Sequence, residues 1–275
     1  MKKYIKNAIK YILYDYKPRK VYIKPEMKSP SELFKGKTVL ITGGSTGIGY
    51  EIAKRFAEES ANVIITGRNE EKLSNAVKSM PNAIYFVNDV KDISTHESLL
   101  KFIEDKYGDI DILINNAGIS NHESDFLNVT EKDFDDQFGI NLKGAYFLTQ
   151  SCIKKVIDKK KKFDIIFITS ERGSQCDILP YGLTKVAMNS LVEGLSCKYY
   201  KHGIRVNAIA PGVTASKLTK IDKNGDLATD HNISKRYFAP EEIAETVLFI
   251  ASDYSLCISG EVIHCNGGNH LNKYW

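Results

Sequence analysis

The chain has 275 residues, 43% of them hydrophobic and 26% charged, and a formal net charge of +4. This length and composition are enough for one large α/β domain with a buried core. Because no apolar run approaches the roughly 18 residues of a membrane span, and the five cysteines lack metal or redox spacing, we expect a cytoplasmic protein with reduced thiols.

The positive charge is concentrated at the amino end of the chain. Residues 1–28 carry nine basic side chains and two acidic ones, so they hold +7 while the remainder holds −3. A domain without a basic surface stripe is not expected to bind nucleic acid. Apolar residues recur at helical spacing among these lysines, so residues 1–34 are predicted to form a basic amphipathic arm. We expect it to pack across the domain or a neighbouring subunit, with contact to an anionic membrane surface as the alternative.

From Lys37 onward, short apolar runs rich in β-branched residues alternate with segments of helical periodicity. This pattern is typical of βαβ units, in which right-handed helical crossovers join parallel strands. We therefore predict an α/β domain over residues 35–275, with a doubly wound, seven-stranded parallel sheet and helices on both faces. The predicted strands cover residues 38–42, 62–66, 83–87, 110–114, 164–168, 205–209 and 261–264.

A glycine-rich turn follows the first predicted strand and precedes a predicted helix. Glycine lets the backbone turn tightly and approach a pyrophosphate, while the free N–H groups of the helix N-terminus attract phosphate. The turn predicts a dinucleotide site in a single Rossmann-type domain, although a purely structural turn can have the same composition. The residues expected to contact the cofactor here are Gly43, Ser45, Thr46, Gly47, Ile48 and Gly49.

The second predicted strand ends at Thr66-Gly67-Arg68, where an NAD-binding fold places an acidic residue on the ribose hydroxyls. Gly67 has no side chain for this contact, whereas the planar guanidinium of Arg68 suits a 2′-phosphate and can stack on adenine. The sequence therefore favours NADPH over NAD as the cofactor. NAD is the alternative if Arg68 only faces solvent.

Tyr181 and Lys185 stand four residues apart at the start of a predicted helix, so they share one face. A tyrosine with a pKa of about 10 is a poor acid–base catalyst at neutral pH, but a neighbouring ammonium favours its phenolate. On their own, the two residues would equally suit a surface pair. Ser170 favours catalysis, because it follows the fifth predicted strand at the edge where open α/β sheets bind ligands. Thr169 and Ser174 are rival hydroxyls, but the strand-end position favours Ser170 as the group that polarises a carbonyl.

Further motifs occur in order along the chain. Asn115-Asn116-Ala117-Gly118 follows the fourth predicted strand, Asn141 lies in a predicted helix, and Pro211-Gly212 follows the sixth predicted strand. Together with the glycine turn and the Tyr-x-x-x-Lys pair, these motifs resemble the short-chain dehydrogenase/reductase family over residues 35–268. Each motif is weak alone, but jointly they are highly specific.

This resemblance implies an oxidoreductase that transfers a hydride between a nicotinamide cofactor and a carbonyl or alcohol. It implies a catalytic tetrad in which Tyr181 is the acid or base and Ser170 orients the substrate carbonyl. Lys185 would bind the nicotinamide ribose, Asn141 would hold a relay water, and both Tyr181 and Lys185 would contact the cofactor. The other cofactor contacts implied by the resemblance are Asp89, Val90, Asn116, Ala117, Gly118, Pro211, Gly212, Val213 and Thr214.

The chain departs from the family pattern at three places. Ser170 precedes Tyr181 by 11 residues, whereas about 13 is more usual in relatives, so the intervening loop is predicted to be short. Asn266-Gly267-Gly268 carries an amide where relatives usually have an aspartate. Lastly, 33 residues precede Phe34, which is more than the fold needs.

Residues 214–237 form a long polar stretch where relatives carry a substrate lid. Its few large apolar side chains favour a small polar substrate, so we predict NADPH-dependent reduction of a ketone to a secondary alcohol. The enzymatic alternatives are an NAD-linked alcohol or polyol dehydrogenase and a 3-oxoacyl thioester reductase. The non-enzymatic alternative is a cofactor-binding regulator without turnover.

Two arginines are candidates for binding an anionic substituent of the substrate. They are Arg172 and Arg236, although an ion pair with Glu171 is the favoured interpretation of Arg172. The six histidines form no metal-spaced cluster, so no metal is expected. We expect a homodimer or homotetramer that acts on a small molecule.

Overall fold

The computed structural model describes residue 20, residue 22, residues 32–159 and residues 161–271. The predicted amphipathic arm therefore lies almost wholly outside the described residues. Phe34, its last residue, is buried in the domain with its ring edge-on to Phe56 and the two ring centroids 4.7 Å apart. Such a pair contributes about 0.5–1.5 kcal/mol beyond the burial itself. Across the described ranges, no helix has both the length and the apolarity needed to cross a membrane.

Seven strands form one parallel sheet in the order β3-β2-β1-β4-β5-β6-β7, which confirms the predicted doubly wound fold. The strands are β1 (Thr38–Thr42), β2 (Asn62–Gly67), β3 (Ala83–Val87), β4 (Ile112–Asn115), β5 (Phe163–Ile168), β6 (Ile204–Pro211) and β7 (Val262–Cys265). The predicted ends differ from these by at most two residues. At β4 the strand begins after Asp111, whose carboxylate Oδ2 accepts a hydrogen bond from the Thr38 backbone N–H at 2.9 Å.

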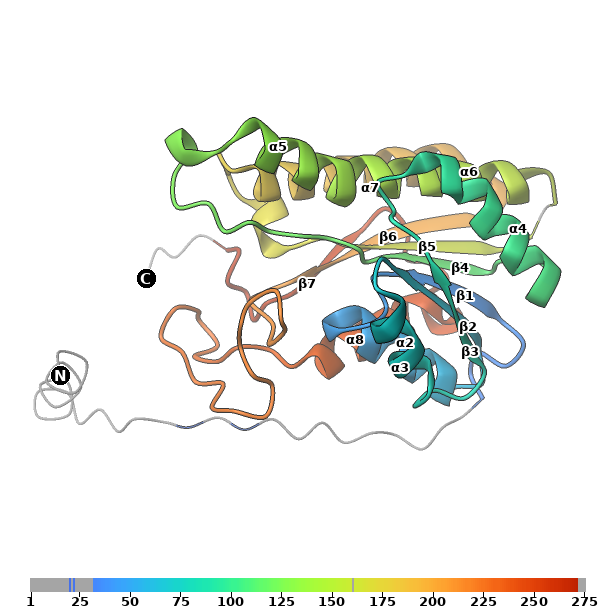
Figure 1. The fold of residues 1–275 in the computed structure, drawn as a ribbon, viewed down its shortest axis with the longest axis horizontal. Coiled ribbons are helices and arrows are strands. Elements are labelled where there is room, and N and C mark those ends of the chain that lie inside the picture. The colour runs from blue at the N-terminus through green and yellow to red at the C-terminus, as the bar shows by residue number, and fades with distance from the viewer. Residues whose placement is uncertain (1–19, 21, 23–31, 160, 272–275) are drawn as a thin grey trace, which may run out of the picture.

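Helices cover both faces of the sheet, as predicted, and Figure 1 shows the two layers. On one face lie α4 (His96–Tyr107), α5 (Glu131–Gln137), α6 (Ala145–Val156) and α7 (Pro180–Tyr199). On the other face lie α2 (Gly47–Glu58), α3 (Glu70–Val77) and α8 (Pro240–Ala251). The long excursion between β6 and α8 extends beyond the sheet (Figure 1).

The sheet is apolar on both sides because each side meets a helical layer. All five residues of β1 are buried. Side chains alternate along a strand, so Val39 and Ile41 join the core beneath α2 and α8, whereas Leu40 joins the core beneath α4, α6 and α7. This double burial explains why the strands read as nearly continuous hydrophobic runs.

The order of strands places a crevice at the centre of the sheet. The neighbours of β1 are β2 on one side and β4 on the other, so the chain reverses direction across the sheet between them. Ligands of open α/β folds bind at this switch point, outside the carboxyl ends of the strands. The glycine turn and the end of β4 both lie there.

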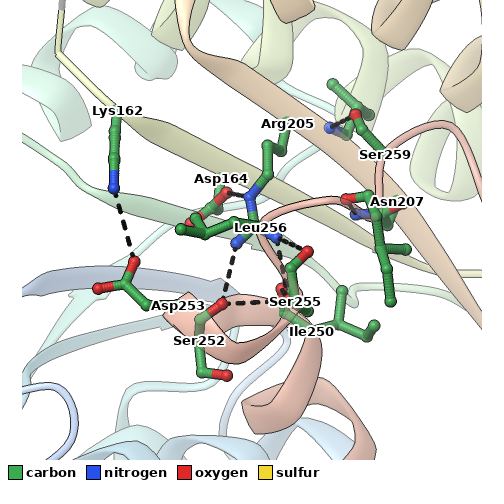
Figure 2. Close-up of polar contacts among 12 residues, drawn as sticks. Lys162, Asp164, Arg205, Asn207, Ile250, Ser252, Asp253, Ser255, Leu256 and Ser259 are labelled. Atoms are coloured by element: carbon green, nitrogen blue, oxygen red, sulfur yellow. Dashed lines mark hydrogen bonds and ion pairs between the residues drawn. The ribbon is translucent and has the colours of Figure 1, made fainter.

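At the opposite, amino edge of the sheet, Arg205 of β6 ties the strands to the segment that follows α8 (Figure 2). Its Nε donates to Asp164 of β5 at 2.7 Å, and its Nη1 donates to the backbone oxygen of Ser255 at 2.7 Å. Nη2 lies 3.4 Å from the Ser252 oxygen. Burial raises the pKa of Asp164, and the hydrogen bond from Arg205 opposes that effect.

Candidate active site

The glycine turn allows two loops to approach at the carboxyl edge of the sheet. Gly43 and Gly47 have positive φ angles of 67° and 60°, which side chains other than glycine rarely adopt. A Cβ added to Gly49 would lie 2.3 Å from Asn116 Nδ2, so a larger residue would displace that amide. The spacing of glycines therefore serves the contact with the loop after β4 as well as the turn itself.

Thr42, at the end of β1, joins these loops. Its Oγ1 accepts hydrogen bonds from the backbone N–H groups of Asn116 and Ala117, each at 3.0 Å. Asn116 Nδ2 in turn donates to the Thr42 and Gly43 backbone oxygens at 2.9 and 3.1 Å. Sequence reasoning missed Thr42, although a buried hydroxyl at the end of an apolar strand is a usable signal.

The start of α2 has the properties of an anion site. Thr46 is the N-cap residue, yet its side chain makes no capping hydrogen bond, and the first turn holds no acidic residue. The first N–H groups of the helix therefore face outward without a side-chain acceptor, and the helix dipole adds positive potential. A phosphate group fits this position.

Beyond the glycine turn, the residues after β2 and β3 that are predicted to contact the cofactor lie in the same cavity. Arg68 is exposed at the end of β2 and lines the cavity together with Asp89 and Val90. One Asp89 oxygen accepts a hydrogen bond from the Lys91 N–H at 3.0 Å, which fixes the turn after β3. Within the described ranges, no carboxylate forms an ion pair with Arg68.

Asn141 is fully buried in a π-helical segment, Phe138–Gly144, between α5 and α6. Its Oδ1 accepts from the Ile119 N–H at 2.8 Å and its Nδ2 donates to the Ile119 oxygen at 2.9 Å. π-Helical turns recur at functional sites because they re-aim a side chain. A Cβ on Gly118 would lie 3.4 Å from Asn141 Oδ1 and 3.8 Å from Lys185 Nζ, so these two polar groups flank the space that Gly118 leaves open.

Ser170 and Tyr181 meet where β5 ends and α7 begins. Burial raises the pKa of the Tyr181 phenol, while a hydrogen bond with the Ser170 hydroxyl and the charge of Arg172 act in the opposite direction. Ser170 also accepts a hydrogen bond from the Arg172 N–H at 3.3 Å, as the cap of the short 3₁₀ helix Glu171–Ser174. Because burial dominates, Tyr181 is held as the neutral phenol, the form that can donate a proton.

Lys185 lies one turn further along α7 and is 3% exposed. Its Nζ donates to the Ile168 backbone oxygen at 2.9 Å and lies 5.6 Å from the centroid of the Tyr181 ring. Burial lowers the pKa of Lys185 to about 8. Within the described part of the chain, no carboxylate forms an ion pair with this ammonium.

Arg172 does not pair with Glu171, so that prediction is wrong. It makes two bonds to Asp177 instead, Nε to Oδ2 at 2.5 Å and Nη2 to Oδ1 at 2.6 Å. A Cβ on Gly182 would lie 1.8 Å from Asp177 Oδ2, so the short loop packs Asp177 directly against the start of α7. Arg236 likewise pairs with a carboxylate, that of Glu242, and it does not line the cavity.

These groups surround a cavity of about 590 Å³. Every residue that the sequence indicates as a cofactor or catalytic residue lines it, except Asn141, which lies behind Ile119. His122 closes part of the rim, because its Nε2 contacts the Leu218 oxygen at 2.8 Å in the segment after β6. No sequence signal distinguished this lone histidine. Among the described residues, no group of three or more histidines, cysteines or carboxylates could hold a metal ion.

Residues 37–226 match the sequence profile described as short chain dehydrogenase. A 3-oxoacyl-(acyl-carrier-protein) reductase of Rickettsia prowazekii is 35% identical over 241 residues, which cover 85% of this chain and 96% of that protein. A dehydrogenase/reductase SDR family member 4 of Caenorhabditis elegans is 32% identical over 256 residues, covering 88% of this chain and 98% of that protein.

Solved structures are similar over the same range. The 3-ketoacyl-(acyl-carrier-protein) reductase from Brucella melitensis, complexed with NADH, has a TM-score of 0.80 at 26% identity and covers 86% of this chain and 99% of its own. A levodione reductase has a TM-score of 0.79 at 26% identity, covering 86% of this chain and 98% of its own. In both cases the similarity covers 86% of this chain.

Proposed function

We propose, from the premise that the chain belongs to the short-chain dehydrogenase family of oxidoreductases, that it reduces the carbonyl of a small polar substrate with NADPH and releases a secondary alcohol. The observation that carries the proposal is the meeting of the Tyr181 phenol, the Ser170 hydroxyl and the buried Lys185 ammonium in one cavity. The glycine turn lies in the same cavity, so cofactor binding and proton transfer would be adjacent.

The residues present fit a dinucleotide. The uncapped start of α2 suits the pyrophosphate, and the glycines leave no side chain in its way. A bound nicotinamide dinucleotide would supply the hydride. The residues proposed to hold it are Gly43, Ser45, Thr46, Gly47, Ile48, Gly49, Arg68, Asp89, Val90, Asn116, Ala117, Gly118, Tyr181, Lys185, Pro211, Gly212, Val213 and Thr214.

Tyr181 is proposed to donate the proton to the carbonyl oxygen of the substrate. Its neutral phenol is the correct form for this step. Ser170 would donate a second hydrogen bond to the same oxygen, so that negative charge developing there meets two hydroxyl donors in a site shielded from water. Lys185 would bind the nicotinamide ribose and favour the tyrosinate that remains after proton transfer, because its Nζ is 5.6 Å from the Tyr181 ring centroid.

Asn141 is proposed to hold a relay water that returns a proton from solvent to the site. The space beside Gly118, between Asn141 Oδ1 and Lys185 Nζ, supports this role. The same Oδ1 already accepts from Ile119, so a water there would share an acceptor with a backbone N–H. A proton arriving at Lys185 would be one turn of helix from Tyr181.

The cofactor is proposed to be NADPH because Arg68 lines the cavity and keeps its guanidinium available. We expect Arg68→Ala to weaken NADPH binding about 10- to 100-fold, the usual contribution of hydrogen bonds to a charged group. NADH binding should weaken much less, because NADH lacks the 2′-phosphate and loses only the stacking of Arg68 on adenine, so it serves as the internal control in the same fluorescence titration. If the mutant keeps its preference for NADPH, Arg68 does not read the 2′-phosphate. If the wild-type protein itself binds NADH as tightly as NADPH, the NAD-linked alcohol or polyol dehydrogenase becomes the better proposal.

The substrate class has a second candidate. Relatives named as 3-oxoacyl-(acyl-carrier-protein) reductases favour a 3-oxoacyl thioester, whereas the polar excursion after β6 favours a sugar ketone or similar compound. A screen of sugar ketones, 3-oxoacyl thioesters and quinones for loss of NADPH absorbance separates these classes. Tyr181→Phe should abolish the turnover found, and Tyr254→Phe, which alters a side chain 78% exposed, should leave it unchanged.

The same screen tests the non-enzymatic alternative. A regulator that binds NADPH tightly but oxidises it with no carbonyl compound would replace the proposed enzyme. We also propose a cytoplasmic homodimer or homotetramer, for which light scattering of the purified full chain is the direct measurement.

A further inference from the structure

The turn that carries Ser170 is tied to the carboxyl-terminal part of the chain by a buried carboxylate that the proposed reaction does not use. Glu171 directly follows Ser170 and is 9% exposed. Its Oε2 accepts hydrogen bonds from Asn266 Nδ2 and Asn269 Nδ2, both at 3.1 Å. Two neutral amides therefore solvate this buried carboxylate, and removing them would leave it poorly satisfied.

Asn266 is held so that its amide nitrogen faces Glu171. The side chain is fully buried. Its Oδ1 accepts from the Gly268 N–H at 3.0 Å and contacts His270 Nδ1 at 3.1 Å. Because a backbone N–H can only donate, the atom it meets is the amide oxygen, and the nitrogen must point to the carboxylate.

The position of Asn266 is fixed by the sheet. Asn266 follows β7, and β7 pairs with β6 up to Pro211 and Cys265. The Gly212 N–H donates to the Cys265 oxygen at 3.0 Å. Asn266 thus moves with the sheet, and Glu171 links the sheet to the turn of Ser170.

Hydrogen bonds within the turn couple its residues, so a displacement of Glu171 would also displace Ser170. The Gly173 N–H donates to the Ser170 oxygen at 2.9 Å, and the Arg172 N–H donates to its Oγ at 3.3 Å. A second contact from the same terminal segment joins Ser174 Oγ to His264 Nε2 at 2.7 Å. The short loop between Ser170 and Tyr181 is therefore attached to β7 through Ser174 and His264, and to the residue after β7 through Glu171 and Asn266.

We infer that Asn266 is a positioning residue for Ser170, whose amide acts through the Glu171 carboxylate to hold the serine hydroxyl where the substrate carbonyl binds. The catalytic consequence rests on the function proposed above. The inference explains why position 266 carries an amide: Asn266→Asp would bring a second carboxylate into hydrogen-bonding distance of Glu171, where two negative charges repel.

The central test exchanges the two chemical groups. Asn266→Asp should lower kcat about 10- to 100-fold, the order expected when a reacting geometry is misplaced, and leave NADPH affinity unchanged. Combining it with Glu171→Gln restores an amide facing a carboxylate with the roles reversed. That double variant should regain kcat to within about threefold of wild type, a difference of about 0.7 kcal/mol. Failure to regain activity in a folded double variant overturns the inference.

Asn207→Asp is the matched control. Asn207 is 2% exposed, its Nδ2 donates to the Ile258 oxygen at 3.0 Å, and its Oδ1 accepts from the Glu261 N–H at 3.1 Å. It therefore suffers the same chemical change in a buried site away from the cavity. Its melting temperature should fall while kcat stays close to wild type, and Glu171→Gln should not rescue it. An equal loss of kcat in this control would mean that Asn266→Asp acts through general instability.

A double-mutant cycle asks whether Asn266 works through Ser170. Adding Asn266→Asp to Ser170→Ala should cause little further loss of kcat, because the hydroxyl to be positioned is already absent. Independent, multiplicative losses would contradict the inference.

Hydrogen exchange provides a readout that does not depend on turnover. The amides of residues 171–175 should exchange faster in Asn266→Asp and recover protection when Glu171→Gln is added. If no carbonyl compound is reduced by the wild-type protein, the proposed function fails, and the exchange pattern still decides whether Asn266 holds the turn.

Discussion

Two buried cations lie at opposite edges of the same sheet, and their surroundings differ. Arg205, at the amino edge, has a carboxylate at 2.7 Å and two oxygens of Ser255 within 3.0 Å (Figure 2). Lys185, at the carboxyl edge, donates to one backbone oxygen, that of Ile168, at 2.9 Å. The buried guanidinium of Arg205 therefore has a carboxylate partner, whereas the buried ammonium of Lys185 has only a backbone oxygen among the described residues.

The difference separates a group kept for folding from a group kept for binding. A buried charge with a partner and hydrogen bonds contributes to one specific structure, whereas removing its partner is strongly destabilising. A buried charge without a carboxylate lowers stability, and the lowered pKa of Lys185 is the measure of that cost. Such a group persists where function needs a cation available to a ligand.

The largest expected effect on stability comes from a substitution at the amino edge of the sheet. Arg205→Met should lower the free energy of unfolding by about 3 kcal/mol, the low end for a broken buried pair, because it leaves Asp164, whose side chain is 19% exposed, without its cation. Denaturant unfolding measures this loss. Adding Asp164→Leu removes the orphaned carboxylate and should recover a large part of it. If the single variant is as stable as wild type, the comparison with Lys185 fails.

The next largest effect is the change with pH in the unfolding free energy of the cofactor-free protein. The folded pKa of Lys185 is about 8, below its ordinary value of 10.5, so between these values the unfolded chain holds a proton that the folded chain has released. Stability contributed by this group must therefore rise with pH through that window, by about 3 kcal/mol. The measurement is the difference in unfolding free energy between wild type and Lys185→Met at pH 7.5 and 10.5. A difference that stays constant would refute the lowered pKa.

Activity should respond to Lys185 in the opposite way from stability. Lys185→Met is expected to reduce turnover about 10²-fold, equivalent to about 2.7 kcal/mol, because the tyrosinate loses its neighbouring charge. Its unfolding free energy near pH 7 should equal or exceed that of wild type. Steady-state kinetics and thermal unfolding on the same preparation give both values, and a strongly destabilised variant would place Lys185 among the structural cations.

The smallest effect sharpens the distinction between buried and surface pairs. Lys162 and Asp253 lie 3.7 Å apart beside the Arg205 cluster, with side chains 69% and 82% exposed. Lys162→Ala should change stability by less than about 1 kcal/mol, and less again at high salt. A larger loss of stability would show that the contribution of this ion pair depends on its proximity to Arg205 rather than on its burial.

Local patterns predicted most of the fold. The strand at 83–87 has the same bounds in the structure, and the glycine turn lies between β1 and α2 as expected. Strand ends were less accurate where a side chain competes with the ladder, as the Asp111 carboxylate does at the start of β4. Residue patterns alone predicted the glycine turn, Arg68, Ser170, Tyr181 and Lys185, and the family resemblance added the further cofactor contacts. All of these line the cavity, whereas Asn141, also implied by the resemblance, does not.

Other features needed the folded chain. The sequence placed Glu171 next to Arg172 and so favoured an ion pair between neighbours, yet Arg172 bonds to Asp177 while Glu171 meets Asn266. The rim contact of His122 also required the folded chain, since its partner Leu218 is 96 residues away in the sequence, and the partners of the Thr42 hydroxyl are 74 and 75 residues away.

By itself, the sequence determined which segments become strands and helices, where the phosphate turn lies, and which tyrosine and lysine share a helix face. These depend on residues within a few positions of one another, through backbone freedom and side-chain periodicity. Only the tertiary structure decided how far Lys185 is desolvated and which group faces Glu171 from 95 residues away. Both depend on which strand ends the sheet brings together, because burial and long-range hydrogen bonds arise only when separate elements pack.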